Sequence, residues 1–246
     1  MDNVLYISMT GAVEIMQAQT IHANNLANVS THGFQADLAQ ARAMQVYGDG
    51  YPARVYVGTE SPATNLSPGS LSETGRSLDI GISGQGYLAV QLADGTEAYT
   101  RAGDLHVDSL GQVLTGSGHL VLGDGGPIAL PAFESVLIGN DGTITVLPQG
   151  QTADNLVVID RLKLVKPELG TLSKGTDGLL HHVSGLPLEP SADVLVVSGF
   201  LENSNVNAVY EMTEILALAR EFEIQMRLMQ AAEENDQAAT ELVTVN

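Results

Sequence analysis

The sequence predicts an α+β protein. Paired N- and C-terminal helices form a coiled-coil axial domain, and an extended connector and a central antiparallel β-rich domain separate them along the chain. Two observations carry this prediction. At both ends of the 246-residue chain, apolar residues recur in alternating steps of three and four, the period of packed helices. In the middle, short apolar runs alternate with turns rich in Gly, Asp and Asn, as in antiparallel sheets.

The N-terminal segment, residues 1–40, predicts one long helix with an apolar seam. No Pro occurs before Pro52, and Gly33 is a residue of the type at which helices commonly stop. The helix is the first half of the predicted axial domain. Its seam residues are Leu5, Met9, Ala12, Met16, Gln19, Ala23 and Leu26.

Residues 41–74 predict an extended connector. They contain Pro52, Pro62 and Pro68 together with several Gly, Ser and Thr residues. Proline interrupts both helical and ladder hydrogen bonding, so no long regular element is expected here.

Residues 75–202 predict a β-rich domain. The runs 87–92 and 97–100 flank Asp94-Gly95, a strong hairpin signal. The alternating residues 143–146 follow another Asp-Gly turn and read as a strand. Strands at this spacing are typical of an antiparallel barrel or a sandwich-like domain.

The C-terminal segment, residues 203–246, predicts the second axial helix. Asn203, Ser204 or Asn205 can cap its start, and no Gly or Pro follows Gly199. The seam residues again step by four and three: Ala208, Met212, Ile215, Ala219, Phe222, Met226 and Met229.

Each terminal helix is expected to be marginal in water by itself, so the seams predict a partner helix. Both apolar stripes are wider than a strict two-position seam. We therefore expect the ends to order fully only when neighbouring subunits cover them. The alternative is an ordinary helical hairpin packed on its own β domain.

The charge and composition exclude several classes of protein. The chain has 10 Lys and Arg residues and 29 Asp and Glu residues, which gives a net charge of -19. This negative charge disfavours binding to nucleic acid or to an anionic membrane. The chain has no Cys, which excludes disulfides and thiol chemistry. No apolar run is long enough to insert into a membrane. The first basic residue is Arg42, so we expect no cleaved signal peptide.

The residues do not form a recognisable enzyme or cofactor site. Most Asp residues lie beside Gly in predicted turns, where the backbone favours them. His181 and His182 are adjacent on a predicted strand and point to opposite faces, so they cannot easily share one metal ion. The Gly-rich loops are not followed by helices, as nucleotide-binding loops would be. We therefore expect no catalytic residue, no metal and no cofactor. A glycan hydrolase and an acidic binding module stay open as competing functions.

Three blocks of the chain resemble one protein family. Residues 23–34, Ala-Asn-Asn-Leu-Ala-Asn-Val-Ser-Thr-His-Gly-Phe, resemble the N-terminal signature of the flagellar basal-body rod, hook and hook-associated proteins. Residues 199–207, Gly-Phe-Leu-Glu-Asn-Ser-Asn-Val-Asn, resemble the C-terminal signature. Between them, 84–87 and 99–103 look like the shared β-domain core.

The resemblance implies a structural subunit of the rod, in its proximal part or, alternatively, its distal part. Its implied partners are copies of itself, other proximal and distal rod proteins and the flagellar type III export apparatus. The rod would cross the periplasm as a helical tube that transmits torque. Phe34 and Leu38 fit the spacing of the family's export-recognition motif. The residues expected to make subunit contacts are Leu5, Met9, Met16, Asn24, Asn25, Leu26, Asn28, Asn203, Asn205, Asn207, Met212, Ile215, Phe222 and Met226.

Overall fold

A computed structural model describes residues 2–39, 41–45, 55–59, 63–151, 155–168 and 170–244. For residues 2–4, 41–45, 55–59 and 241–244 it describes the backbone alone. Much of the predicted connector, including Pro52 and Pro62, lies outside the described residues. The chain divides into two compact units. Unit 1 comprises Met1–Asn28, Ala36–Asn65 and Val206–Asn246, and unit 2 comprises Val29–Gln35 and Leu66–Asn205.

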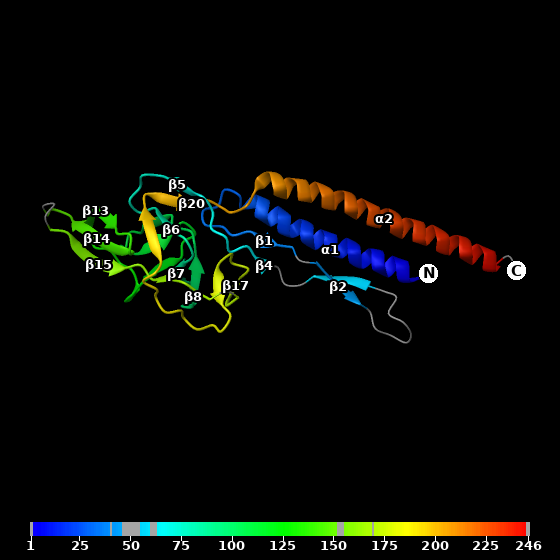
Figure 1. Ribbon diagram of the computed structural model, residues 1–246, viewed down its shortest axis with the longest axis horizontal. Coiled ribbons are helices and arrows are strands. Elements are labelled where there is room, and N and C mark those ends of the chain that lie inside the picture. Colours follow the sequence, from blue (N-terminus) through cyan, green and yellow to red (C-terminus); the bar gives the residue numbers. More distant parts are fainter. Residues whose placement is uncertain are drawn as a thin grey trace. The chain divides into compact units, whose positions relative to one another are not determined.

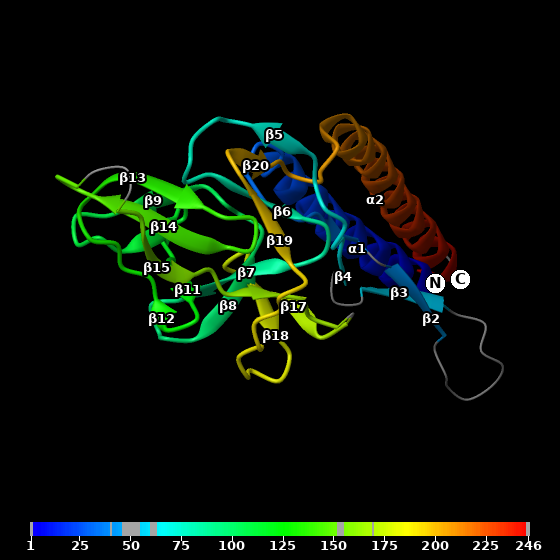
Figure 2. The ribbon, with the colours of Figure 1, turned by 60° about the vertical axis from the view of Figure 1, so that its left-hand side comes forward.

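Unit 1 is built on the helices α1 (Asp2–Ala27) and α2 (Ala208–Thr244), which lie side by side and antiparallel (Figures 1 and 2). The start of α1 and the end of α2 consequently lie at the same end of the helix pair. Two short antiparallel pairs complete the unit: β1 (Asp37–Leu38) with β4 (Ala63–Thr64), and β2 (Ala41–Gln45) with β3 (Val55–Thr59). Strand β3 packs beside α1.

The predicted α+β content agrees with this structure, but the predicted coiled-coil axial domain is wrong. Seam residues that a coiled coil would bury are about half exposed, among them Met16 and Met212, each with 55% of its surface accessible. The buried positions of α1 include the small residues Ser8 and Ala12. Small residues let helix backbones approach but do not supply the large interlocking side chains of a coiled coil. Because both helices are apolar on more than one face, the sequence period alone does not select the buried face.

The start of α2 also differs from the prediction. Asn207 is the capping residue, since its side-chain Oδ1 accepts hydrogen bonds from the amides of Val209 (3.0 Å) and Tyr210 (3.2 Å). Asn203 and Asn205, the expected caps, lie in unit 2 and bind its backbone.

Unit 2 consists of antiparallel strands. Its largest sheet has the order β17 (Leu172–Lys174), β18 (Leu180–His182), β8 (Glu97–Thr100), β7 (Tyr87–Gln91), β11 (Leu120–Gly123), β10 (Val113–Thr115), β9 (Leu105–Val107). Beside this path, β12 (Gly126–Pro127) pairs with β11, and β16 (Leu164–Val165) pairs with β7. A second sheet has the order β13 (Phe133–Ile138), β14 (Thr143–Pro148), β15 (Val157–Arg161). Two further pairs are β19 (Leu195–Ser198) with β6 (Ile80–Ser83) and β20 (Phe200–Glu202) with β5 (Leu71–Glu73).

The predicted hairpin around Asp94-Gly95 is confirmed. Strands β7 and β8 pair with Ala89 opposite Tyr99. Gly95 adopts φ +85°, and the Asp94 carboxylate accepts bonds from the amide (2.9 Å) and the hydroxyl (2.6 Å) of Thr96. The bonds from Thr96 hold the pKa of Asp94 below its usual value. The strand predicted at 143–146 is likewise present as part of β14.

The core of unit 2 is aliphatic. Its larger cluster is built from Ile, Leu, Val and Ala side chains of several strands, with Leu88, Val90 and Ile80 fully buried. A smaller cluster contains Tyr87 and Tyr99, and burial raises the pKa of the Tyr99 phenol. Burying one such aliphatic side chain contributes roughly 1.5–3 kcal/mol, which accounts for a stable unit without disulfides. Among the described residues, we find no helix with the length and apolarity to span a membrane.

Candidate functional site: the terminal segments

The apolar residues predicted for contacts on α1 lie mostly at the surface of unit 1. Leu5, Met9 and Met16 are exposed, and Leu26 is half-buried. Exposed apolar side chains that gather on one element mark a surface that another molecule can cover. The N-terminal helix therefore carries free apolar surface in the isolated chain.

Helix α2 shows the same feature. Of its predicted contact residues, Ile215 and Phe222 are half-buried, while Met212 and Met226 are exposed. The helix also exposes other large apolar residues, namely Val209, Tyr210, Leu216, Ile224 and Leu228. Helix α2 therefore carries apolar surface that α1 does not cover.

The Asn residues near the end of α1 have different roles. Asn25 is only 1% exposed, and its amide bonds the backbone of Asp37 and the carboxylate of Glu211. Asn28 donates from Nδ2 to the carbonyl of Asn24 at 2.9 Å, which satisfies a group at the helix end. Asn24 has an exposed side chain. The structure thus places Asn24 at the surface and Asn25 inside unit 1.

The Asn residues before α2 bind the chain within unit 2. The amide of Asn203 donates to the carbonyl of Ser70 at 2.9 Å. Asn205 donates from its amide to the carbonyl of Phe34 (3.2 Å) and from Nδ2 to that of Ser67 (2.9 Å). These bonds hold together the segments of unit 2 that precede α2 and follow α1 in the chain.

The two residues of the candidate export motif lie in different units. The ring of Phe34 belongs to unit 2, with Lys174 Nζ 3.9 Å from the ring centroid. Leu38 lies in β1 of unit 1 and is exposed. Their spacing in the sequence stays a prediction about the chain during export.

Unit 2 contains a buried ion pair that the sequence did not predict. Arg101 and Glu202 are each 2% exposed, and Arg101 Nε lies 2.8 Å from both carboxylate oxygens. Arg101 also donates to the carbonyl of Gly86 at 2.6 Å, and Glu202 accepts from the amide of Gly69 at 2.8 Å. Burial raises the pKa of the nearby Tyr87 phenol. Spacing could not reveal this pair, because 101 positions separate its members.

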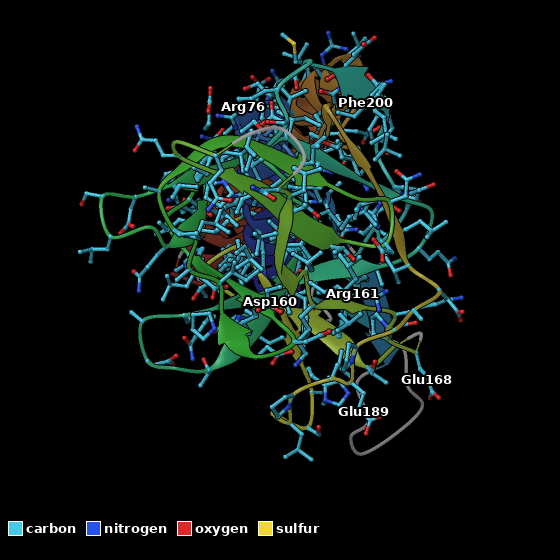
Figure 3. The ribbon with its side chains drawn as sticks, turned by 90° about the vertical axis from the view of Figure 1, so that its left-hand side faces the viewer. Arg76, Asp160, Arg161, Glu168, Glu189 and Phe200 are labelled. Carbon is cyan, nitrogen blue, oxygen red and sulfur yellow. The ribbon has the colours of Figure 1, made fainter. Side chains whose placement is uncertain are left out.

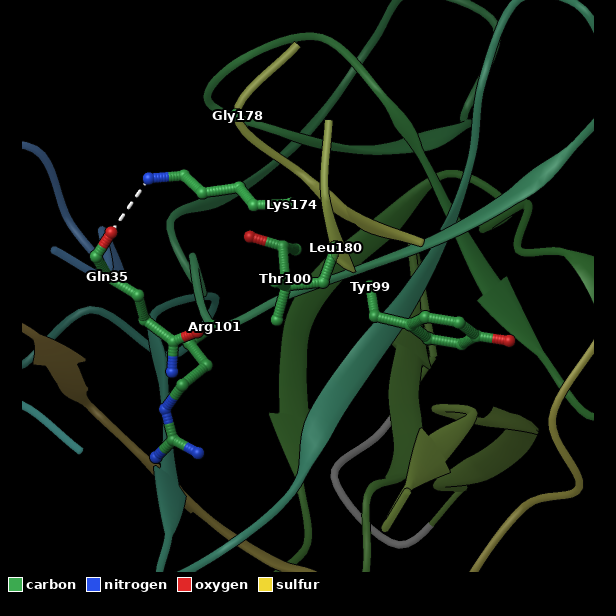
Figure 4. A pocket seen from close by; sticks show the side chains of 8 residues that line it. Gln35, Tyr99, Thr100, Arg101, Lys174, Gly178 and Leu180 are labelled. Atoms are coloured by element: carbon green, nitrogen blue, oxygen red, sulfur yellow. Dashed lines mark hydrogen bonds between the residues drawn. The ribbon is translucent and has the colours of Figure 1, made fainter. Parts of the chain in front are cut away.

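Figure 4 shows a small hollow in unit 2 beside this pair. Its volume is about 10 Å³, about the least space that can hold one water molecule. Lys174 Nζ donates to the carbonyl of Gln35 at 2.8 Å across it. A second hollow of about 50 Å³ is lined in part by Lys166 and Leu172. Both are far smaller than the 300–1,000 Å³ or so of ordinary ligand pockets.

Several charged side chains of unit 2 lie at separate places on its surface. Figure 3 shows Glu168 and Glu189 on loops apart from Asp160 and Arg161. Arg161 donates from Nε to the carbonyl of Asp141 at 2.8 Å, a contact that supports a turn. Within the described ranges, no three His, Asp or Glu side chains are grouped so that they could hold a metal ion.

Comparisons with known proteins identify the family. The model described as "Flagellar hook protein FlgE/F/G D1 domain" matches residues 81–146, and "Flagellar basal body rod FlgEFG protein C-terminal" matches residues 197–242. The flagellar basal-body rod protein FlgF of Escherichia coli is 40% identical over the whole of both chains. FlgF of Caulobacter vibrioides is 32% identical over 98% of each chain. FlgG of Bacillus subtilis is 31% identical over 94% of this chain and 95% of its own.

The matches cover both signatures that the sequence carries, and the FlgF relatives span the full length of the chain. The chain therefore belongs to the flagellar basal-body rod protein family and is of the FlgF type.

Proposed function

We propose that this protein builds the proximal part of the flagellar rod, a helical tube that crosses the periplasm and transmits torque. It acts as a structural subunit and not as a catalyst. The observation that carries the proposal is the apolar surface left exposed on α1 and α2, which a neighbouring subunit can bury. Contacts between unlike surfaces of identical subunits generate an open helix, as a tube requires.

In this proposal, each part of the chain has a separate role. Residues 1–40 and 203–246 make the subunit contacts, residues 75–202 form the outer domain, and residues 41–74 connect them. The partners are further copies of the chain and other proximal and distal rod proteins. The flagellar type III apparatus exports the chain from the cytoplasm without cleaving a signal peptide, and Phe34 and Leu38 contribute to recognition there.

A distal-rod role is the second candidate. Relatives named FlgG are about as long as this chain, and one from Buchnera aphidicola is 31% identical over 97% of it. Complementation separates the two roles. A strain that lacks its FlgF gene should be restored by this chain, and a strain that lacks FlgG should not.

The test of the subunit role uses two exposed positions on α2. Leu216→Asp with Ile224→Asp places charges on a surface that carries little of the monomer's own packing, since these residues are 62% and 55% exposed. We expect the full-length double variant to fold but to leave cells without flagella when it replaces the native chain. Electron microscopy of basal bodies and a motility assay provide the readout.

The matched control is Leu216→Met with Ile224→Met, which keeps the same positions apolar. This variant should build normal rods. Normal flagella from the Asp variant would show that this surface of α2 makes no essential contact. Cleavage of cell-wall glycan by the purified chain would contradict the structural role and favour an enzyme.

A further inference from the structure

The helix pair of unit 1 contains a buried polar cluster. His22 Nδ1 of α1 lies 2.5 Å from Oε2 of Glu211 on α2, and their side chains are 13% and 6% exposed. Asn25, one turn further along α1, donates from Nδ2 to the other oxygen of the same carboxylate at 3.3 Å. The His22 ring also meets the ring of Tyr210 edge-on, with centroids 6.4 Å apart. Both carboxylate oxygens of Glu211 thus have partners on α1.

Asn25 extends the cluster to a third segment. Its Nδ2 donates to the carbonyl of Asp37 at 2.8 Å, and its Oδ1 accepts from the amide of Asp37 at 2.9 Å. Asp37 begins β1, where its own carboxylate accepts a bond from the Thr64 hydroxyl of β4. One Asn side chain therefore joins α1, α2 and the β1–β4 pair.

Part of the remaining helix contact is made by small residues, which do little to define the register. The buried positions Ser8 and Ala12 are small, and a Cβ at Gly11 would lie 3.3 Å from the flexible amide of Gln225. Small side chains offer few ridges, so a shift by one helical turn, about 5.4 Å, changes their packing little. The same shift would remove at least one of the two partners of the buried Glu211 carboxylate, which is unfavourable.

We propose that His22, Asn25 and Glu211 form a register lock: three positioning residues that fix α1 against α2 and against β1 within one chain. Buried polar residues are known to select register in packed helices at the expense of some stability. This assignment gives Asn25 a role inside the subunit, whereas the sequence predicts a contact between subunits. It concerns the single chain and stands whether or not the chain builds a rod.

The chain has no Cys, so a pair of introduced cysteines can report the register. Gly11 lies about 17 Å along α1 from His22, and Gln225 lies about 21 Å along α2 from Glu211, so Gly11→Cys and Gln225→Cys do not alter the lock. In the purified full-length chain, a short thiol cross-linker should join positions 11 and 225. Cysteines placed instead at Glu221 or Met229, one turn away on α2, should cross-link to position 11 at least fivefold less.

Removing the lock should abolish this preference. With Asn25→Ala and Glu211→Ala, we expect cross-linking at 11–225 to fall at least fivefold relative to the 221 and 229 pairs. The matched controls Asn24→Ala and Glu214→Ala change neighbouring residues of the same type and should keep the parent pattern. If the alanine variant loses its helical circular dichroism, the milder Glu211→Gln is measured instead, and it should shift the same ratio in the same direction.

Two outcomes would overturn the proposal. An unchanged preference for 11–225 in the lock variants would assign the register to apolar packing. A parent chain that cross-links equally at 221, 225 and 229 would show that the cluster does not fix the pair. A general loss of helix lowers all three yields together, so the ratio distinguishes loss of register from loss of structure.

Discussion

Glu202 is the buried counter-charge of Arg101, and it also accepts a bond from the Gly69 amide. Glu202→Gln would leave the guanidinium without its charged partner inside unit 2. Breaking a buried pair on one side costs about 3–5 kcal/mol, so we expect a loss of that order in the free energy of unfolding. Urea denaturation of the full chain measures it. Glu189→Gln, at an exposed position (Figure 3), should change the free energy by less than about 0.5 kcal/mol.

Gly33 illustrates a backbone requirement at a single residue. It adopts φ +68°, and a Cβ there would lie 2.3 Å from the backbone nitrogen of Ala102. We expect Gly33→Ala to destabilise the protein by more than about 2 kcal/mol, because backbone must move and the left-handed conformation is strained. Gly84 also has a positive φ (+79°), but a Cβ there would meet no atom within 4 Å. We therefore expect Gly84→Ala to lower the free energy of unfolding by only about 1 kcal/mol. Thermal or urea unfolding measures both variants, and an equal loss of stability in Gly33→Ala and Gly84→Ala would contradict the steric argument.

At the scale of the element, the cap of α2 is the clearest case. Asn207 bonds the free amides of Val209 and Tyr210. Asn207→Ala should therefore cost about 1 kcal/mol and speed hydrogen exchange at these two amides. Asn235→Ala, at an exposed position within α2, should leave exchange there unchanged, since Ala is a better helix former than Asn. Unchanged exchange in Asn207→Ala would mean that tertiary contacts, not the cap, order this turn.

The strands were more predictable than the helix faces. The hairpin of β7 and β8 has an Asp-Gly turn between alternating runs, and these local signals determine its register. The buried face of α1 has no comparable signal, because Met9, Val13 and Met16 are as apolar as any residue that could be buried. The covered face includes Asn25, and its partner Glu211 lies 186 positions away in the sequence. Periodicity identifies helices but cannot rank several apolar faces of one helix.

The candidate site shows the same division. The signatures around Asn25 and Asn203 identify the segments that form the candidate site. The Asn residues within them nevertheless differ in role: some cap a helix, some bond the backbone inside a unit, and some are exposed. Asn207 caps α2, while Asn205 bonds the backbone of Ser67 in unit 2. An amide can donate and accept in any of these settings, so its residue type leaves the partner undetermined.

At the scale of the whole molecule, the charge opposes self-association while the exposed helix surface favours it. Each chain carries a net charge of -19, so identical copies repel one another at long range. The proposed contact surface is nearly free of charge on α1, whose sequence has no Lys or Arg and only Asp2 and Glu14 as acids. Apolar burial is not screened by salt, whereas the repulsion is.

Raising the ionic strength should therefore strengthen association of the purified chain. Between about 0.01 M and 0.15 M NaCl the Debye length falls from about 30 Å to about 8 Å, which removes most of the repulsion between copies. Sedimentation velocity at fixed protein concentration should show larger species as salt increases. Leu216→Asp with Ile224→Asp should stay monomeric throughout, because screening cannot restore the lost apolar contact. Association that weakens with salt would instead show that charge pairs, made by the chain's few basic residues, hold the subunits together.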